Sequence, residues 1–585
     1  MVKLLRINMT DRTYEMEDLP EKYKYLAGRG LTSFVVADEV DPLCHPLGPN
    51  NKLVFSPGFV TGTSAPTSAR ISAGAKSPLT GGIKESNSGA AWAPALAALG
   101  IKALVIEGQP TEKRKYWLIR LAWDEGAGAP SLEFMPADEY VGRDLYEVFP
   151  ELFERFGKVS VAGIGVAGEN LYSNSGIVYE DQANRPARYS GRGGLGAVMG
   201  SKGLKFIILD RKGAPGVELA DKEVFEQGRK KLTDALLTHD VTKPKGALNS
   251  YGTAVLVNII NEAGAFPTRN FSSGRFEGAA KISGEAIFEG NKERLGKELY
   301  NHACSPGCII QCSNTWHKPD GTEHVSCMEY ESIWAFGANC GIDDLDTIAE
   351  LIRLCNAYGL DTIEAGDAVA VAMEGGLAEF GDGKAAIKLL HKMGKGKAVG
   401  RILGSGTANT ARVLGVTRAP VVKGQSMPAY EPRAIKGIGM TYAISTMGAD
   451  HTSGYTIAPE IMACGGDVDQ FDRDKAELVR AFQYTTAFLD STGHCLFIAF
   501  AILDIASGFE GMVEECNGVL GTQWTGEDVT RIGKEILDKE RAFNEAAGIG
   551  KEADRIPEFM KYEKLPPHNV VWDVPDETLD AVWED

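Results

Sequence analysis

Three cysteines follow one another at intervals of four residues, at Cys304, Cys308 and Cys312. Three thiolates this close repel one another unless a cation neutralises them, so the spacing indicates a metal site. Packing is the alternative, because a spacing of four places small apolar side chains on one face of a helix. Pro306 and Gly307 lie inside the string and argue against a regular helix. Zinc and an iron–sulfur cluster both accept four cysteines, but a tight triplet with one distant partner is more typical of a cubane cluster.

A fourth cysteine ligand has to come from elsewhere in the chain. The remaining cysteines are Cys44, Cys327, Cys340, Cys355, Cys464, Cys495 and Cys516. Cys495 stands out because it ends the string Asp490-Ser-Thr-Gly-His-Cys, and a related string, Asn356-Ala-Tyr-Gly-Leu-Asp, lies upstream. Each string follows a stretch with helical spacing, and two related copies indicate two similar ligands bound by two similar domains. A glycine that caps a helix C-terminus would explain both strings without any ligand, and this alternative stays open.

The elements that must position these residues change in type along the chain. Short apolar runs separated by Gly and Pro predict a strand-rich first part, with runs at 5–8, 53–55, 103–106 and 206–209. Helical spacing dominates afterwards, over 221–235, 345–357, 365–380, 385–392, 471–507 and 526–546. We predict a multidomain α+β protein with domains at 1–210, 211–419 and 420–585.

Composition limits the classes of function. The chain has 585 residues, of which 44% are hydrophobic, so several cores can form. Its net charge is −18 and no basic run stands out, which argues against a nucleic-acid partner. No apolar stretch is long enough for a signal peptide or a membrane helix, so we expect a cytoplasmic protein. Ten cysteines in such a protein favour metal ligation or burial over disulfides.

Five strings in one chain carry a resemblance to a known family. They are Ser86-Asn-Ser-Gly, Arg185-Pro-Ala-Arg-Tyr-Ser-Gly-Arg-Gly-Gly-Leu-Gly-Ala-Val-Met-Gly, the cysteine triplet, Glu329-Tyr-Glu-Ser and the paired strings that begin at Asn356 and Asp490. Through them the chain resembles the tungsten-containing aldehyde:ferredoxin oxidoreductases over nearly its whole length. The resemblance implies an N-terminal β-rich domain that forms a saddle for two pterins, followed by two mainly α-helical domains that close over it.

The resemblance also implies cofactors and the residues that bind them. The cofactors are a tungsten bis-pyranopterin, one [4Fe–4S] cluster and a Mg²⁺ ion that bridges the pterin phosphates; molybdenum in place of tungsten stays open. The implied cluster ligands are Cys304, Cys308, Cys312 and Cys495. The implied pterin-binding residues are Arg70, Asn87, Ser88, Gly89, Arg188, Tyr189, Gly191, Arg192, Asn356, Leu360, Asp361, Asp490, His494 and Leu496. Arginines and backbone N–H groups suit phosphates, and magnesium suits oxygen ligands such as those of Asn87 and Tyr189.

Two residues match the family's positions for the chemistry. Oxidising an aldehyde with water needs a group that takes protons and a group that orients the carbonyl. The resemblance assigns general acid–base catalysis to Glu331, with a solvated surface glutamate as the alternative and Glu329 as the substitute if the register shifts by two. It assigns orientation of the substrate oxygen and proton relay to His451, with an ordinary structural histidine as the alternative. Tyr442 is a further candidate for the polar wall of the pocket.

The glycine string at 191–196 also fits a dinucleotide-binding fingerprint, with Asp210 at about the distance of the ribose-binding acid. That fingerprint needs a buried strand directly before it. Residues 181–190 contain an asparagine, a proline and two arginines, so we expect no core strand there. The arginines favour contact with phosphates of another kind.

The sequence departs from the family pattern at several positions. The first interval of the cysteine triplet is one residue longer than expected, and Asn356 replaces an aspartate. Met447 and Ser453 stand where Arg and Lys are expected. These departures indicate a distinct branch, and one branch contains the tungsten subunit of the enzyme that reduces benzoyl-CoA. Cys327, which lies four residues before the catalytic candidate Glu331, is either an extra metal ligand or a buried free thiol.

These observations leave three functions. We predict reversible tungsten-dependent oxidation of small aldehydes to carboxylic acids, with electrons leaving through the cluster to a ferredoxin or an iron–sulfur subunit, with or without a flavin subunit. The alternatives are the tungsten subunit of an aromatic-ring reductase of the benzoyl-CoA type and a non-catalytic, metal-stabilised electron-transfer protein. A single cluster and the lack of a convincing flavin or NAD motif imply that other subunits carry the electrons onward, and we expect an oligomer.

Overall fold

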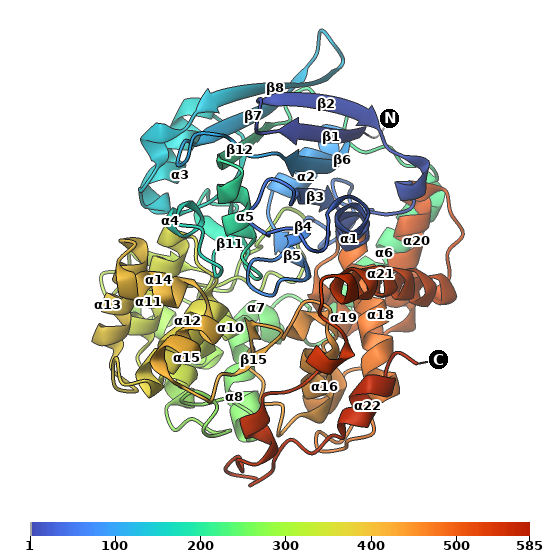
Figure 1. The fold of residues 1–585 in the computed structure, drawn as a ribbon. Helices are drawn as coiled ribbons and strands as arrows, with labels where there is room; N and C mark the ends of the chain where they lie inside the picture. Colours follow the sequence, from blue (N-terminus) through green and yellow to red (C-terminus); the bar gives the residue numbers. More distant parts are fainter. Residues whose placement is uncertain (1–2, 585) are drawn as a thin grey trace.

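Two six-stranded β-sheets form the N-terminal part of the protein (Figure 1). The computed structural model describes residues 3–584, so Met1, Val2 and Asp585, at the ends of the predicted first and third domains, lie outside the described residues. The first sheet has the order β2-β1-β6-β3-β4-β5, with β1 (Lys3–Asn8), β2 (Thr13–Asp18), β3 (Leu53–Pro57), β4 (Arg70–Lys76), β5 (Ile83–Gly89) and β6 (Ile101–Glu107). The second has the order β11-β10-β9-β12-β7-β8, with β7 (Trp117–Asp124), β8 (Ala129–Pro136), β9 (Ser160–Gly163), β10 (Ile177–Glu180), β11 (Pro186–Ser190) and β12 (Leu204–Asp210).

One apolar core joins the two sheets. Trp92, at the start of a short helix, is fully buried; its ring centroid lies 5.2 Å from that of Phe55 in the first sheet and 5.8 Å from that of Tyr179 in the second. Its indole N–H donates to the carbonyl of Ile207. The helices of this part are α1 (Gly28–Glu39), α2 (Trp92–Ala98), α3 (Leu145–Phe156), α4 (Val166–Glu169) and α5 (Leu195–Ser201). The two sheets therefore pack as one unit through a shared apolar core, and the helical region contacts this unit.

The rest of the chain is mainly helical, and most of it lies below the sheets in Figure 1: the yellow helices form one group, the orange to red helices another, and the green helix α6 (Lys222–Thr238) lies with the second group beside α20 (Ala506–Leu520). Its first part contains α6 (Lys222–Thr238), α7 (Ala247–Tyr251), α8 (Leu256–Glu262), α9 (Gly284–Leu295), α10 (Tyr330–Phe336), α11 (Leu345–Tyr358), α12 (Thr362–Glu374), α13 (Gly383–Gly394), α14 (Ala398–Gly404) and α15 (Thr407–Leu414). Its second part contains α16 (Lys436–Ile444), α17 (Ile457–Ile461), α18 (Ala476–Thr492), α19 (Ala499–Asp504), α20 (Ala506–Leu520), α21 (Gly526–Ala546) and α22 (Asp576–Ala581). Two small hairpins accompany them, β13 (Thr315–His317) with β14 (Glu323–Ser326), and β15 (Val421–Val422) with β16 (Gln425–Ser426).

The predicted fold class is confirmed: β-sheets come first and a mainly helical region follows. Each of the four predicted apolar runs lies in a strand, and helices occupy each stretch with helical spacing. The division of the helical region near 420 stays a prediction. Helix α6, in the predicted second domain, packs along α20 in the predicted third, and Gly228 and Gly511 allow the two backbones to approach closely.

One expectation about local structure is wrong. Residues 186–190 form a buried strand, β11, directly before the glycine string at 191–196. An edge strand tolerates a proline as its first residue and alternating polar side chains, which is why its composition did not indicate a strand. Strand β11 pairs antiparallel with β10 and does not neighbour β12, so the parallel βαβ unit of a dinucleotide-binding fold is not formed here.

Each sheet contacts the C-terminal end of one long helix. At the first sheet, the N–H of Phe59, just after β3, donates to the carbonyl of Ser491 in the last turn of α18, and the N–H of Arg70 in β4 donates to the carbonyl of Gly493 just after that helix. In the second, residues 174–176 exchange backbone hydrogen bonds with residues 359–361, just after α11. Gly359 and Gly493 both have left-handed φ, of 77° and 93°, so each caps its helix; that the two strings also bind a ligand stays a prediction. The strings also fix the helical region to the sheets. Within residues 3–584, no helix combines the length and apolar character that crossing a membrane requires.

Candidate functional site

A cavity of about 300 Å³ lies where the sheets meet both parts of the helical region, and we call it the central cavity. Sixteen of the twenty residues predicted for the site line it: Arg70, Asn87, Ser88, Gly89, Arg188, Tyr189, Gly191, Cys304, Cys312, Glu331, Asn356, Leu360, Asp361, His451, Cys495 and Leu496. Strand pairing brings Arg70 together with Asn87, Ser88 and Gly89, because β4 pairs with β5 in a register that places Arg70 opposite Gly89. Both helix-end strings contribute, and the space between them is open rather than filled with side chains.

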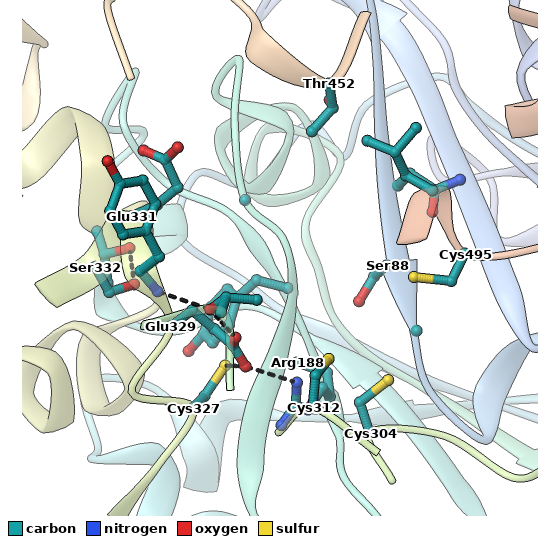
Figure 2. A pocket seen from close by; sticks show the side chains of 18 of the residues that line it. Ser88, Arg188, Cys304, Cys312, Cys327, Glu329, Glu331, Ser332, Thr452 and Cys495 are labelled. Carbon is teal, nitrogen blue, oxygen red and sulfur yellow. Dashed lines mark hydrogen bonds and ion pairs between the residues drawn. The ribbon is translucent and has the colours of Figure 1, made fainter. Parts of the chain in front are cut away.

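The four predicted cluster cysteines converge at one side of the central cavity. Figure 2 shows Cys304, Cys312 and Cys495 on the side where Ser88 also lies, with Glu331 on the opposite side. Cys308 is buried behind them, and its thiol donates a hydrogen bond to Cys304. This bond, with Arg188 and Arg70 nearby, holds the pKa of Cys304 well below its usual value. The loop that carries the triplet is not helical, so the packing alternative fails.

The spacing of these sulfurs distinguishes between two kinds of metal site. Among the described residues, no three of the four sulfurs lie within 4.8 Å of one another. A single zinc ion with Zn–S bonds of about 2.3 Å would hold its sulfurs roughly 3.8 Å apart. The wider spacing, with all four sulfurs facing one region, suits a polynuclear cluster better than one ion.

Two arginines, Arg70 and Arg188, line the central cavity close to Cys304. The Nε atoms of Arg70 and Arg188 are buried and have no hydrogen-bond partner. A Cβ added to Gly89 would lie 2.9 Å from the Arg70 guanidinium and 3.2 Å from the Cys304 sulfur, so only glycine leaves room for both. Buried donors without acceptors are costly, and an anionic group in the cavity would satisfy them. These donors fit the phosphates and ring oxygens of a pterin.

A second cavity of about 240 Å³, the side cavity, adjoins the first and shares residues such as Asn87 and His451 with it. Here Arg192 and Asp490, the remaining predicted residues that line a cavity, join charged groups that the sequence analysis did not assign to the site. The latter are Arg29, Lys84, Glu85 and Asp450. In the sequence, the only sign of these four residues is that each is a charged residue within a Gly-rich or apolar stretch.

Buried ion pairs connect the side cavity to the surrounding elements. Arg29 in α1 lies 2.8 Å from Glu540 in α21 and 3.3 Å from Asp490 at the end of α18. The Lys84 ammonium lies 2.9 Å from Asp450 and holds the pKa of that carboxyl far below its usual value, against the effect of burial. Burial and the nearby Glu85 raise the pKa of Asp490 to about 8. Asp490 can therefore hold a proton at neutral pH and offer a ligand either a donor or an acceptor.

Glu331 and His451 face each other in the central cavity. The Glu331 Oε1 atom lies 3.4 Å from His451 Nε2, and its Oε2 atom accepts a hydrogen bond of 2.9 Å from the N–H of Ala429. Burial raises the pKa of Glu331 to about 8 and lowers the pKa of His451 to about 4. Glu331 Oε1 and His451 Nδ1 are buried without a hydrogen-bond partner, as is the hydroxyl of Tyr442. The surface-glutamate alternative is therefore wrong, and the pair suits proton exchange near neutral pH.

Three further tyrosines enclose this pair. The hydroxyls of Tyr430 and Tyr455 lie 2.8 Å apart, and the rings of both lie against the His451 imidazole. The ring of Tyr330 packs at a tilt of 41° behind that of Tyr430, and its hydroxyl donates to the carbonyl of Ala429. Because an aromatic wall excludes water, it strengthens electrostatic interactions inside the cavity. Sequence reasoning missed these tyrosines, since nothing in their local strings distinguishes them from core residues.

Cys327 lines the central cavity on the side of Arg188. Its thiol lies 3.7 Å from Glu329, which in turn lies 3.7 Å from the Arg188 guanidinium (Figure 2). Glu329 also accepts a hydrogen bond of 2.7 Å from Thr253. Burial raises the pKa of Cys327 to about 12, so the thiol keeps its proton in this setting. The Glu329 carboxylate therefore already interacts with neighbouring side chains, whereas the Oε1 atom of Glu331 has no hydrogen-bond partner.

Two predicted residues, Cys308 and His494, line neither of these cavities. The imidazole of His494 is fully buried, with Nε2 2.9 Å from Glu515 and Nδ1 3.0 Å from the Thr492 hydroxyl. The His494 side chain lines neither cavity, whereas the neighbouring Cys495 and Leu496 line the central cavity. The predicted contact between His494 and a pterin is therefore not supported.

An apolar cavity of about 310 Å³ adjoins the central cavity. The two share Thr253, Leu256 and Phe497, and the remaining lining residues carry no charge: Val241, Ala247, Leu248, Val255, Ile259, Ile461, Met462 and Phe500. A molecule with a polar end at Glu331 could place an apolar portion there.

Comparison with known proteins yields matches over nearly the whole chain. A family model described as "Aldehyde ferredoxin oxidoreductase, N-terminal domain" matches residues 4–211, and one described as "Aldehyde ferredoxin oxidoreductase, domains 2 & 3" matches residues 227–584. The chain is 37% identical to a tungsten-containing aldehyde ferredoxin oxidoreductase of Pyrococcus abyssi, covering 96% of this chain and 92% of that protein. It is 27% identical to the WOR-like subunit of an aliphatic sulfonate oxidoreductase of Pyrococcus furiosus, covering 96% and 90%. Among solved structures, the active-site complex BamBC of benzoyl coenzyme A reductase superposes with a TM-score of 0.76 at 18% identity, covering 95% and 90%.

Proposed function

The chain belongs to the aldehyde ferredoxin oxidoreductase family, and from this membership we propose that it oxidises aldehydes to carboxylic acids, reversibly, with the help of tungsten. The observation that carries the proposal is the convergence of a Glu331–His451 pair and four cysteines on one central cavity. Oxidation of an aldehyde with water releases two electrons and two protons, so the site must dispose of both.

The residues around the cavities fit the cofactors that the relatives' names and the sequence imply. Cys304, Cys308, Cys312 and Cys495 would hold a [4Fe–4S] cluster. The unpaired Nε atoms of Arg70 and Arg188, with Arg192 in the side cavity, support binding of a phosphate-bearing pterin. We propose that Mg²⁺ binds beside Asn87 and Tyr189, where oxygen ligands are available. Bound in this space, a tungsten pterin centre would supply the two-electron oxidation, and molybdenum could serve in its place.

The protein's own groups would handle the protons and the substrate. Glu331 would take a proton from the water or the hydrated aldehyde, because its pKa of about 8 allows both protonation states near neutral pH. The neutral imidazole of His451 would orient the substrate oxygen, and the tyrosine wall would exclude bulk water. The adjoining apolar cavity would take the alkyl or aryl group of the aldehyde.

Electrons would leave through the cluster, because the loop 304–312 lines the central cavity with Cys304 and Cys312 and reaches the surface at Gly307 and Gln311. We propose a ferredoxin or an iron–sulfur subunit as acceptor, with or without a flavin subunit, in a cytoplasmic oligomer. We do not extend the substrate of benzoyl coenzyme A reductase to this chain, since at 18% identity the likeness concerns the fold.

The test is a steady-state comparison of substrates on tungsten-loaded protein with viologen dyes. We expect benzaldehyde and acetaldehyde to reduce oxidised viologen and benzoyl-CoA to leave reduced viologen unchanged. Oxidation of reduced viologen by benzoyl-CoA, with no reaction of either aldehyde, would overturn the proposal.

A further inference from the structure

Three possible metal ligands outside the cavities lie close together. Within residues 3–584, His239, Cys464 and Asp504 form the one group of three such residues whose ligand atoms all lie within 4.8 Å of one another. His239 Nε2 lies 3.0 Å from Asp504 Oδ2, and the Cys464 thiol contacts the same carboxylate. The cluster cysteines are spaced more widely, so this group differs from them in the kind of metal it suits.

The three residues come from three separate segments that the fold brings together. His239 caps the C-terminus of α6, Cys464 lies in the loop after α17, and Asp504 is the last residue of α19. The Asp504 carboxylate is already oriented, because its Oδ1 accepts a hydrogen bond of 2.7 Å from the N–H of Gly465. Cys464 is 5% exposed and the Asp504 side chain 34% exposed, so an ion could enter from the carboxylate side.

We propose that His239, Cys464 and Asp504 bind one zinc ion, with water as the fourth ligand. Nitrogen, sulfur and oxygen donors in one set suit Zn²⁺, whereas Mg²⁺ and Ca²⁺ prefer oxygen alone. Tetrahedral zinc holds such donors roughly 3.5 Å apart, so the three side chains need to move by about 1 Å or less. The Gly465 hydrogen bond to the non-coordinating oxygen would orient the carboxylate in the bound state.

Binding changes two protons at the site. The thiol of Cys464 loses its proton to solvent when its sulfur coordinates the ion. At present the N–H of Val241 donates to His239 Nδ1 over 3.3 Å, so Nε2 carries the imidazole proton. Coordination through Nε2 moves that proton to Nδ1 and replaces the Val241 hydrogen bond. One proton is therefore released for each zinc ion bound.

The position of the ion indicates what it would do. Val241, two residues after His239, and Met462, two residues before Cys464, both line the apolar cavity beside the central cavity. The Cys464 thiol also contacts the carbonyl of Met462. A zinc ion would tie this rim to α6 and α19 and keep the loop after α17 closed over the apolar cavity. The role is structural, and it does not depend on which aldehyde the enzyme oxidises.

The experiment compares wild-type protein with Cys464→Ser and Asp504→Asn, each with a full complement of cluster iron. Cys44→Ser, which alters a buried cysteine in a separate apolar cluster beside the first sheet, serves as the control. After dialysis against zinc and then buffer, we expect one zinc per chain in the wild type and control, and at least a tenfold lower zinc affinity in both variants. Calorimetry in two buffers should give one proton released, and zinc-edge absorption should show one sulfur neighbour.

Equal zinc content in wild type and both variants, or a zinc neighbour shell without sulfur, would overturn the proposal. The His239–Asp504 contact would then be an ordinary hydrogen bond at a helix corner. Asp504→Asn keeps the acceptor for Gly465, so its fold is preserved even if Cys464→Ser proves unstable.

Discussion

Replacement of Glu331 by glutamine should make the protein more stable and nearly inactive. Burial raises the pKa of Glu331 from its usual 4.5 to about 8. At pH 7 the unfolded chain therefore carries this carboxylate ionised while the folded protein keeps it protonated. Stability contributed by this residue is lost as pH rises above 4.5, at about 1.4 kcal/mol per pH unit, until the folded pKa is reached.

The size of the effect follows from the difference between the pKa of the unfolded chain, 4.5, and the working pH. Between pH 4.5 and pH 7 the free energy of unfolding falls by about 3 kcal/mol, and a glutamine, which does not titrate, does not cause this loss. The amide oxygen of Glu331→Gln can still accept the hydrogen bond from Ala429, so local packing is kept. Loss of a general acid–base group should lower kcat/KM for aldehyde by about 10²–10⁴-fold. The rise of wild-type activity through pH 8 should vanish as well.

Two measurements check this prediction. Denaturation midpoints of wild type and Glu331→Gln should coincide near pH 4 and diverge as pH rises toward 8, while viologen reduction gives kcat/KM across the same range. The matched control is Glu262→Gln, whose side chain is 84% exposed and should change neither quantity. A stability gain that is equal at pH 4 and pH 7, or activity within twofold of wild type, would refute the reasoning.

Other perturbations have equally definite outcomes. Cys495→Ser should abolish the iron–sulfur absorption and most of the bound iron, whereas Cys44→Ser should keep both; full iron in the first variant would contradict the ligand assignment. Arg29→Met leaves the buried carboxylate of Glu540 without its arginine partner and should destabilise the protein by about 3–5 kcal/mol in denaturant titration; a change under 1 kcal/mol would show that the pair contributes little. Gly58→Ala places a Cβ 2.0 Å from the backbone facing it, so both the thermal midpoint and the iron content should fall. His451 has its pKa lowered to about 4, so wild-type stability should fall as pH drops from 6.5 to 4, and His451→Gln should remove that part of the acid sensitivity.

The sequence predicted the fold class because hydrophobic periodicity changes from short apolar runs to helical spacing near residue 210. It failed at 186–190, where an edge strand accepts a proline and two polar side chains. The packing of α6 on α20 could not be foreseen either, since their interface depends on glycines far apart in the chain.

The candidate site was predictable where local strings carry chemistry. The cysteine triplet, the strings after α11 and α18, and Glu331 all line the central cavity or lie beside it. The network of Arg29, Lys84 and Asp450 was not predictable, because a buried ion pair is a property of tertiary packing. His494 shows the opposite error: its string lies at the site, but its side chain turns toward Glu515.

Diffraction data collected at the iron and tungsten absorption edges from the holoprotein test the central claim most directly. Iron signal should lie among the sulfurs of Cys304, Cys308, Cys312 and Cys495, and tungsten signal should lie in the central cavity beside Glu331. Iron elsewhere in the molecule, or a cavity with no heavy metal in active protein, would contradict the account.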